Sequence, residues 1–370
     1  MKLKRHTAVL ALAAASVLML SACGSDVNTT TPGAPSGGAA AVSCGGKKSL
    51  TAEGSTAQQN AMDAFIAAYQ QACPGYNLAY NGTGSGAGVK QFTAGLVDIG
   101  GTDSPLDPSK GETTAAANRC KNNPAWDLPM VFGPITVAFN LKGVNDLTLN
   151  PETIAKIFSG QIKTWNDPAI AALNSGVTLP ATPIAVQYRS DQSGTTDNFQ
   201  TYLKDASKGV WTKGTGKTFN GGVGEGKQGN PGVGQGVSAT NGAIGYVEWS
   251  FSQQNKLTIA KIDSGSGPVA LTNESVGKAI DGATIKGEGN DLVLDLNSIY
   301  SSSASGAYPL VLATYELACS KGYDPDTATA VKAFLTAAAT TGQNQLSSIG
   351  YIPLPQAFQN KILTAIKAIS

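Results

Sequence analysis

Histidine is almost absent from this sequence, because the one histidine of the 370-residue chain is His6, in a segment that we expect to be removed. The remaining chain would have no imidazole for acid–base catalysis or metal binding. There is no CxxC pair, which argues against a thiolate metal site, and no G-x-x-x-x-G-K-[ST] loop, which argues against an ATPase. Histidine-dependent hydrolases and most zinc sites are therefore excluded, and we expect neither a metal nor a cofactor.

Long apolar runs are also scarce, and the one that stands out lies at the N-terminus. It spans residues 8–20, follows three basic residues (Lys2, Lys4 and Arg5) and ends just before Cys23. A spanning helix needs about 20 apolar residues, so this run is too short and is typical of an export signal over residues 1–22. We therefore expect an extracytoplasmic protein.

The end of this signal, Leu20-Ser21-Ala22-Cys23, resembles the bacterial lipoprotein box. In that motif the signal is cut before the cysteine, which then receives lipid such as palmitate. An ordinary small-residue cleavage site is the alternative. Lipid on Cys23 would anchor the chain to the outer face of the cytoplasmic membrane.

Net charge is low as well. Removal of residues 1–22, with three basic side chains and no acidic one, changes the formal charge from +1 to −2. A nucleic-acid partner is therefore not expected.

Four cysteines remain apart from Cys23, namely Cys44, Cys73, Cys120 and Cys319. In an oxidising compartment they favour two disulfides, for which three connectivities are possible. Among the three we predict Cys44 with Cys73 and Cys120 with Cys319. The second bond would fasten the C-terminal segment to the first lobe.

The order of predicted elements indicates an α/β fold. Residues 23–43 are rich in Ser, Thr, Pro, Gly and Ala and are predicted to be a flexible tether. The rest is longer than one core usually serves, so we expect two lobes, each with a mainly parallel sheet flanked by helices. Strands are predicted at 48–53, 76–80 and 184–188, and a helix follows each one. The glycine-rich residues 220–236 are predicted to be a mobile surface loop ahead of a short helix.

Hydroxyl side chains mark the junctions between predicted strands and helices: Ser55 and Thr56, then Ser85, then Ser193 and Thr195. The unpaired N–H groups and the dipole of a helix N-terminus favour an anion there. A helix N-cap is the alternative at any single junction. Taken together, these junctions predict an anion site.

Several motifs occur in an order and at a spacing that resemble a known family. They are Gly54-Ser55-Thr56, Gly84-Ser85 with Gly88-Val89-Lys90-Gln91, Asp98-Ile99-Gly100 with Asp103-Ser104-Pro105-Leu106, Arg189-Ser190-Asp191-Gln192-Ser193-Gly194-Thr195, and Gly242-Ala243-Ile244-Gly245-Tyr246-Val247-Glu248. From about Leu50 onward, the chain resembles the phosphate-binding proteins of bacterial high-affinity phosphate importers.

This resemblance implies a two-lobed periplasmic-binding-protein (Venus flytrap) fold. Lobe one would comprise residues 45–130 and 309–370, and lobe two residues 135–304, with chain crossings near 129–134 and 307–310. The implied phosphate ligands are Thr56, Ala57, Ser85, Asp103, Arg189, Ser193, Gly194 and Thr195, with Asp191 paired to Arg189. The family often has an aromatic residue at the position of Ala57, where the contact is through the backbone N–H.

The implied activity is the capture of inorganic phosphate and its delivery to the membrane permease subunits of an ABC importer, by a monomer without enzyme activity. Asp103 fits this activity, because a carboxylate beside an anion is repulsive unless the anion carries a proton. Phosphate at neutral pH carries one, and sulfate does not. The alternatives are a binding protein for another oxyanion such as sulfate or molybdate, and a secreted phosphohydrolase with Ser85 or Ser193 as nucleophile, for which no base is evident.

Overall fold

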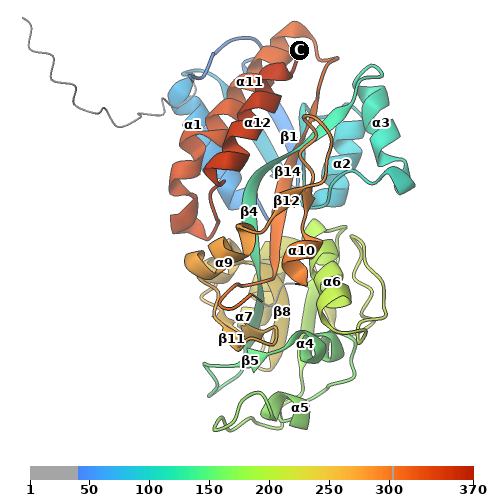
Figure 1. Ribbon diagram of the computed structural model, residues 1–370, viewed down its shortest axis with the longest axis vertical. Helices are drawn as coiled ribbons and strands as arrows, with labels where there is room; N and C mark the ends of the chain where they lie inside the picture. Colours follow the sequence, from blue (N-terminus) through green and yellow to red (C-terminus); the bar gives the residue numbers. More distant parts are fainter. Residues whose placement is uncertain (1–40, 302–303) are drawn as a thin grey trace, which may run out of the picture. The chain divides into compact units, whose positions relative to one another are not determined.

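A nine-stranded mixed sheet runs through the computed structural model (Figure 1), which describes residues 41–301 and 304–370. These residues belong to the compact unit Ala39–Ser370. The expected signal (1–22), Cys23 and most of the expected tether lie outside the described residues.

The strand order of the large sheet separates two groups of strands. In spatial order the strands are β2 (Asn77–Gly82), β1 (Ser49–Gly54), β3 (Ile99–Thr102), β14 (Val311–Cys319), β4 (Ala125–Asn140), β8 (Ala243–Glu248), β6 (Ala185–Arg189) and β7 (Glu225–Lys227), and β9 (Thr258–Ile259) pairs with β4. At one end β1 is parallel to β2 and β3, and at the other β6 is parallel to β7 and β8. The outer strands are thus parallel, as expected.

The central strands β4 and β14 pair antiparallel, and they connect the two groups. β4 pairs with β14 from Ala125 to Pro134 and with β8 from Ile135 to Asn140. β14 is also antiparallel to β3, so the sheet is mixed where these strands pass between the lobes. Nearly every residue of β4 and all of β14 are buried, because these strands have neighbours on both edges and both faces.

Lobe one contains β1, β2 and β3 with helices on both sides, as Figure 1 shows. Its helices are α1 (Gln59–Ala72), α2 (Ser85–Thr93), α3 (Glu112–Arg119), α11 (Pro325–Ala339) and α12 (Gln356–Ala368), with the 3-10 helices η1 (Pro108–Lys110) and η2 (Thr341–Ile349). Met62, Phe65 and Tyr69 lie on the buried face of α1, as their spacing predicts.

Lobe two contains β6, β7 and β8 and the shorter helices. These are α4 (Pro151–Phe158), α5 (Pro168–Ala171), α6 (Gly194–Ala206), α7 (Gly229–Ala239), α8 (Trp249–Gln254), α9 (Asn273–Ile280) and α10 (Asn297–Tyr300). A small sheet of β11 (Pro268–Val269), β10 (Lys261–Asp263) and β5 (Thr148–Leu149) completes it. A second small sheet, of β12 (Thr284–Ile285) and β13 (Leu294–Asp295), lies against lobe one, where the Leu294 N–H donates to Tyr315 on β14 over 3.1 Å. Within the described ranges, no helix has both the length and the apolar character needed to cross a membrane.

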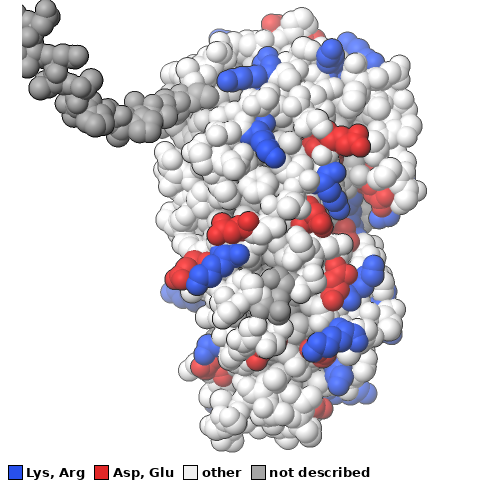
Figure 2. All heavy atoms as spheres, viewed as in Figure 1, with Lys and Arg blue, Asp and Glu red and all other residues white. Residues whose placement is uncertain are grey.

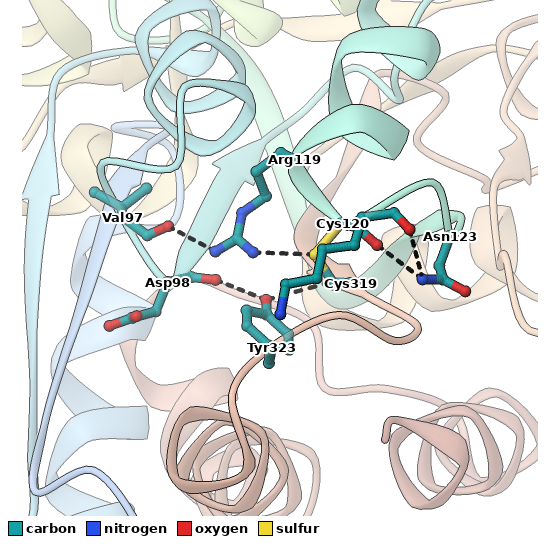
Figure 3. The surroundings of a disulfide bond; sticks show 8 residues. Val97, Asp98, Arg119, Cys120, Asn123, Cys319 and Tyr323 are labelled. Carbon is teal, nitrogen blue, oxygen red and sulfur yellow. Dashed lines mark hydrogen bonds between the residues drawn. A yellow bond between two sulfur atoms is a disulfide. The ribbon is translucent and has the colours of Figure 1, made fainter.

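Both predicted disulfides are present. Cys44 pairs with Cys73, and Cys120 with Cys319. The second bond links the end of α3 to the end of β14 (Figure 3), and the Arg119 guanidinium donates to Cys319 Sγ over 3.1 Å. Arg119 also lies against the rings of Phe92 and Tyr323, 4.9 and 4.7 Å from their centroids. The bond therefore joins the C-terminal strand to lobe one.

The prediction of a surface loop over residues 220–236 is wrong. Residues 225–227 form β7, and α7 begins at Gly229 with Asn230, Val233 and Gly234 buried. Small residues allow α7 to lie close to its neighbours: a Cβ at Gly236 would lie 2.7 Å from Gln187 Oε1, and one at Gly234 would lie 2.9 Å from Asn255 Nδ2. The glycines therefore reflect tight helix packing.

Candidate functional site

Helix N-termini from both lobes meet where the lobes face each other. α2 begins at Ser85 in lobe one, and α6 begins at Gly194 in lobe two. A Cβ at Gly194 would lie 2.7 Å from Ser85 Oγ and 2.6 Å from Asp103 Cβ, so the two lobes are in close contact here. Glycine is needed at position 194 because any side chain would displace these groups.

The serine and threonine residues at the strand–helix junctions differ in whether their side-chain oxygens cap a helix. Ser193 is an N-cap, because its Oγ accepts from the Thr196 N–H over 3.1 Å. The first turns of α1 and α2 have no such side-chain cap. Near the start of α1, the Ala57 N–H donates to Ser55 Oγ over 3.0 Å. The N-cap alternative is thus correct for Ser193, which still has its own O–H to donate.

Asp103 is buried at the end of β3 among hydroxyl donors. Its Oδ1 accepts from Thr314 Oγ1 over 2.8 Å, and its Oδ2 accepts from Ser85 Oγ over 3.3 Å and from Thr195 Oγ1 over 3.4 Å. Burial raises the pKa of Asp103, while hydrogen bonds from Ser55 and Thr314 and the charge of Arg189 act in the opposite direction. The carboxyl is therefore an acceptor with direct contacts to both lobes.

Arg189 supplies a buried positive charge at the end of β6. Its side chain is 1% exposed and forms a two-pronged ion pair with Asp191, in which Nε donates to Oδ1 over 2.8 Å and Nη2 donates to Oδ2. Burial alone would raise the pKa of Asp191, but the hydrogen bonds and charge of Arg189 bring it below its usual value. The pair expected from the sequence is present, and Nη1 of Arg189 lies 3.4 Å from Thr195 Oγ1.

Thr56 of lobe one is held by a residue that sequence reasoning missed. The backbone N–H and Nδ2 of Asn230, at the start of α7, each donate to Thr56 Oγ1 over 3.1 Å. Nδ2 also donates to Thr195 Oγ1 over 3.2 Å. Asn230 has no exposed surface, and it was missed because it lies in the segment predicted to be a surface loop.

Thr314 and Asn198 were missed as well. Thr314 contacts Asp103 from β14, more than two hundred positions along the chain, so spacing gives no signal for it. Asn198 Nδ2 donates to the carbonyls of Asp103 and Gly194, each over 2.8 Å. A polar residue inside a fully buried strand is the one cue that points to Thr314.

Further polar contacts join the lobes around this site. Ser104 Oγ donates to Asp197 Oδ2 over 2.7 Å, and Asn60 Nδ2 donates to Ser250 Oγ over 2.8 Å. A cavity of about 130 Å³ lies beside Asp103 and Asn198. The predicted phosphate ligands with polar side chains are all at most 2% exposed, so the site is closed to solvent in this structure.

The chemistry of the site is that of an oxyanion receptor. Hydroxyl groups, helix N-termini and one guanidinium can donate to oxygen, and Asp103 can accept a proton. On the face in Figure 2, basic and acidic side chains are interspersed, so this face has no extended basic surface that would attract an anion. Among the described residues, no group of three or more His, Cys, Asp or Glu is placed to hold a metal.

Known phosphate-binding proteins are similar to this chain in sequence and in fold. The family model of the PBP superfamily domain matches residues 29–339. The chain is 54% identical over 372 residues to "Phosphate-binding protein PstS 2" of Mycobacterium tuberculosis and 52% identical over 373 residues to "Phosphate-binding protein PstS 3" of Mycobacterium leprae, with 100% of each chain covered.

Among solved structures, a putative phosphate ABC transporter substrate-binding protein from Clostridium perfringens, with bound phosphate, is similar with a TM-score of 0.60. It is 19% identical, and the match covers 83% of this chain and 100% of that one. At this identity the likeness shows the two-lobed fold.

Proposed function

This chain belongs to the PBP superfamily and, within it, to the PstS phosphate-binding proteins, and from that membership we propose that it captures inorganic phosphate between its lobes and delivers it to an ABC importer. The observation that carries the proposal is the set of hydroxyl and guanidinium donors around Asp103. Hydrogen phosphate needs many donors and one acceptor for its own proton, which this set supplies.

The proposed ligands are contributed by both lobes. Lobe one provides Thr56, the Ala57 N–H, Ser85 and Asp103, and lobe two provides Arg189, Ser193, the Gly194 N–H and Thr195. Oriented N–H groups and hydroxyls replace the hydration shell of a buried dianion, so one arginine is sufficient as its countercharge. The Ala57 N–H would have to exchange its bond to Ser55 Oγ for one to phosphate.

Lobe closure is the proposed signal to the membrane permease. Residues 45–130 with 309–370, and residues 135–304, would move as two bodies about the β4 and β14 crossing. β4 changes partner from β14 to β8 between Pro134 and Ile135, which supports a hinge at this point. A closed protein with phosphate would dock on the permease as a monomer.

Anchoring by lipid on Cys23 is a further part of the proposal. It rests on the sequence from Leu20 to Cys23, and it would keep the protein on the outer face of the cytoplasmic membrane. Intact mass measurement of protein from the membrane fraction, with Cys23→Ala as control, tests it. An unmodified mass for the wild type would disprove the anchor.

Titration calorimetry with phosphate, sulfate and molybdate tests the main proposal, together with an assay of chromogenic phosphate ester hydrolysis. We expect phosphate to bind most tightly and no hydrolysis. Tighter binding of sulfate or molybdate would assign another oxyanion. Turnover that is lost on replacement of Ser85 or Ser193 would establish a phosphohydrolase instead.

A further inference from the structure

The hydroxyls of Thr56 and Thr195 come from opposite lobes and share one donor, the side-chain amide of Asn230. Nδ2 lies 3.1 Å from Thr56 Oγ1 and 3.2 Å from Thr195 Oγ1. The orientation of the amide is fixed because its Oδ1 accepts from the Glu248 N–H over 2.9 Å. Nδ2, rather than Oδ1, therefore faces the two threonines.

Each threonine oxygen already has two N–H donors. Thr56 Oγ1 accepts from the backbone N–H and from Nδ2 of Asn230, both over 3.1 Å. Thr195 Oγ1 accepts from Asn230 Nδ2 over 3.2 Å and from Arg189 Nη1 over 3.4 Å. Its own O–H donates to Asp103 Oδ2 over 3.4 Å, and it would exchange this bond for one to a bound oxyanion. A hydroxyl oxygen can accept two hydrogen bonds and donate one. Because both acceptor positions of each threonine are occupied, each hydroxyl can only donate to a ligand.

We propose that Asn230 is a positioning residue that fixes the hydroxyls of Thr56 and Thr195 as donors toward the bound oxyanion, and so leaves Asp103 to accept the proton of the ligand. Free hydroxyls would rotate, and each could also accept from a protonated oxygen of the ligand. With both hydroxyls fixed, the protonated oxygen of phosphate is directed to Asp103. This inference rests on the proposed function, because it assigns roles at the same site.

Asn230 also links the orientation of the Thr56 hydroxyl to lobe closure. It lies in lobe two and contacts Thr195 within its own lobe, but it reaches Thr56 only when lobe one is closed on it. The Thr56 hydroxyl is therefore free to rotate in an open protein and becomes a fixed donor on closure. Part of the discrimination between anions would thus arise in the closing step.

A double-mutant cycle tests the proposal with inorganic phosphate as the probe. Asn230→Ala is made in the wild type and in a Thr56→Val/Thr195→Val background, and phosphate affinity is measured by calorimetry. Loss of a buried hydrogen-bonded amide predicts a roughly 10- to 100-fold weaker affinity in the wild-type background. Without the two hydroxyls the same substitution should change affinity by less than about threefold.

Asn198→Ala is the matched control. Asn198 is a buried asparagine of the same lobe, but its amide donates to the carbonyls of Asp103 and Gly194 and not to the threonines. Its effect on phosphate affinity should be the same factor in both backgrounds. Melting temperatures of all variants separate losses of folding from losses of binding.

Asn230→Asp keeps the shape of the side chain. It replaces Asn230→Ala in the double-mutant cycle if the alanine variant does not fold. Its carboxylate would accept the two threonine protons and turn the hydroxyl lone pairs toward the ligand, so it should bind phosphate more weakly than Asn230→Ala does. If Thr56→Val/Thr195→Val restores the phosphate affinity of Asn230→Asp, the result supports Asn230 as the residue that positions the two hydroxyls.

Two results are decisive against the proposal. If the wild type binds phosphate but the Asn230 substitutions cost the same factor in both backgrounds, Asn230 acts only on stability or packing and the inference alone is wrong. If the wild type does not bind phosphate, the proposed function is wrong and the inference falls with it.

Discussion

Glu112 of lobe one and Lys217 of lobe two form an ion pair across the cleft, with 3.1 Å between Oε1 and Nζ. The Lys217 side chain is 8% exposed and that of Glu112 is 18% exposed. The Lys217 carbonyl accepts from the Ser193 N–H over 2.8 Å, and Glu112 Oε2 accepts from the Asp107 N–H over 2.9 Å. The pair therefore connects the segment after Asp103 with the N-cap of α6.

Replacement of this pair should favour the open protein. Glu112→Gln keeps the shape and removes the charge, so the closed state loses stability and the apparent phosphate affinity should fall by about 3- to 10-fold. Small-angle scattering of the phosphate-free variant should give a larger radius of gyration than the wild type gives. Asp146→Asn, which removes the same charge from the exposed pair with Lys261, is the control and should change neither quantity. Equal effects of both variants would reject a role of the pair in closure.

Arg189→Ala should weaken phosphate binding by about 2–5 kcal/mol, because it removes a buried cation from the proposed anion site. The substitution also leaves the negative charge of Asp191 without its cation, so this charge is no longer neutralised beside the site. Calorimetry at constant ionic strength measures the loss. A loss below about 0.5 kcal/mol would place the ligand elsewhere.

Asp103→Asn should reduce the preference for phosphate over sulfate while phosphate binding persists. The carboxylate repels an anion that has no proton to offer, and a carboxamide has no charge and can donate. Thr314 Oγ1, which donates to Asp103 Oδ1, would hold the carboxamide oxygen in place. Titration of wild type and variant with both anions decides the point. If the variant rejects sulfate as strongly as the wild type does, selectivity comes from cleft size or donor geometry.

Glu316 on β14 should make stability depend on pH. Both of its oxygens are buried, and this burial raises its pKa to about 8. The side-chain amide of Gln58 lowers this pKa, and the charge of Asp103 raises it further. The folded protein therefore keeps a proton that the unfolded chain loses above its ordinary pKa of 4.5. Since the folded state binds more protons, the free energy of unfolding falls as pH rises from 4.5 to 8, by up to about 1.4 kcal/mol per pH unit.

Glu316→Gln should flatten this dependence, since an amide does not titrate. Urea unfolding at pH 5, 6.5 and 8 measures it, and the stability of the variant relative to the wild type should increase with pH. Burial also raises the pKa of Glu248 well above its usual value, so some dependence should remain in the variant. Parallel curves for the two proteins would show that Glu316 is charged in the folded state.

Local patterns in the sequence predicted the parts of the site that are local in the chain. The turns before α1, α2 and α6 followed from apolar spacing and from Ser, Thr and Gly at the junctions, because capping and helix periodicity act over a few residues. Asp103 and Arg189 needed the family motifs, since an acid after a short strand is otherwise a common turn residue.

The contacts that join distant segments were not predictable from spacing. Thr314 reaches Asp103 because β14 returns to lie beside β3, and Lys217 reaches Glu112 because the lobes are closed. Asn230 was missed because glycine in a sequence indicates a loop unless the packing around it is known. The close approach of α7 to Gln187 is a tertiary property that favours a helix there despite its glycines.

The position of β14 between β3 and β4 has a consequence for biogenesis. An exported chain emerges N-terminus first, so β3 and β4 are both available before their shared neighbour arrives. Until Val311–Cys319 inserts, each presents an open edge of the kind that pairs with other chains. The strands β6, β7 and β8 of lobe two, in contrast, can assemble on β4 as soon as Glu248 has emerged. Lobe one should therefore be completed last, and the Cys120–Cys319 bond would fix the strand insertion that completes the large sheet.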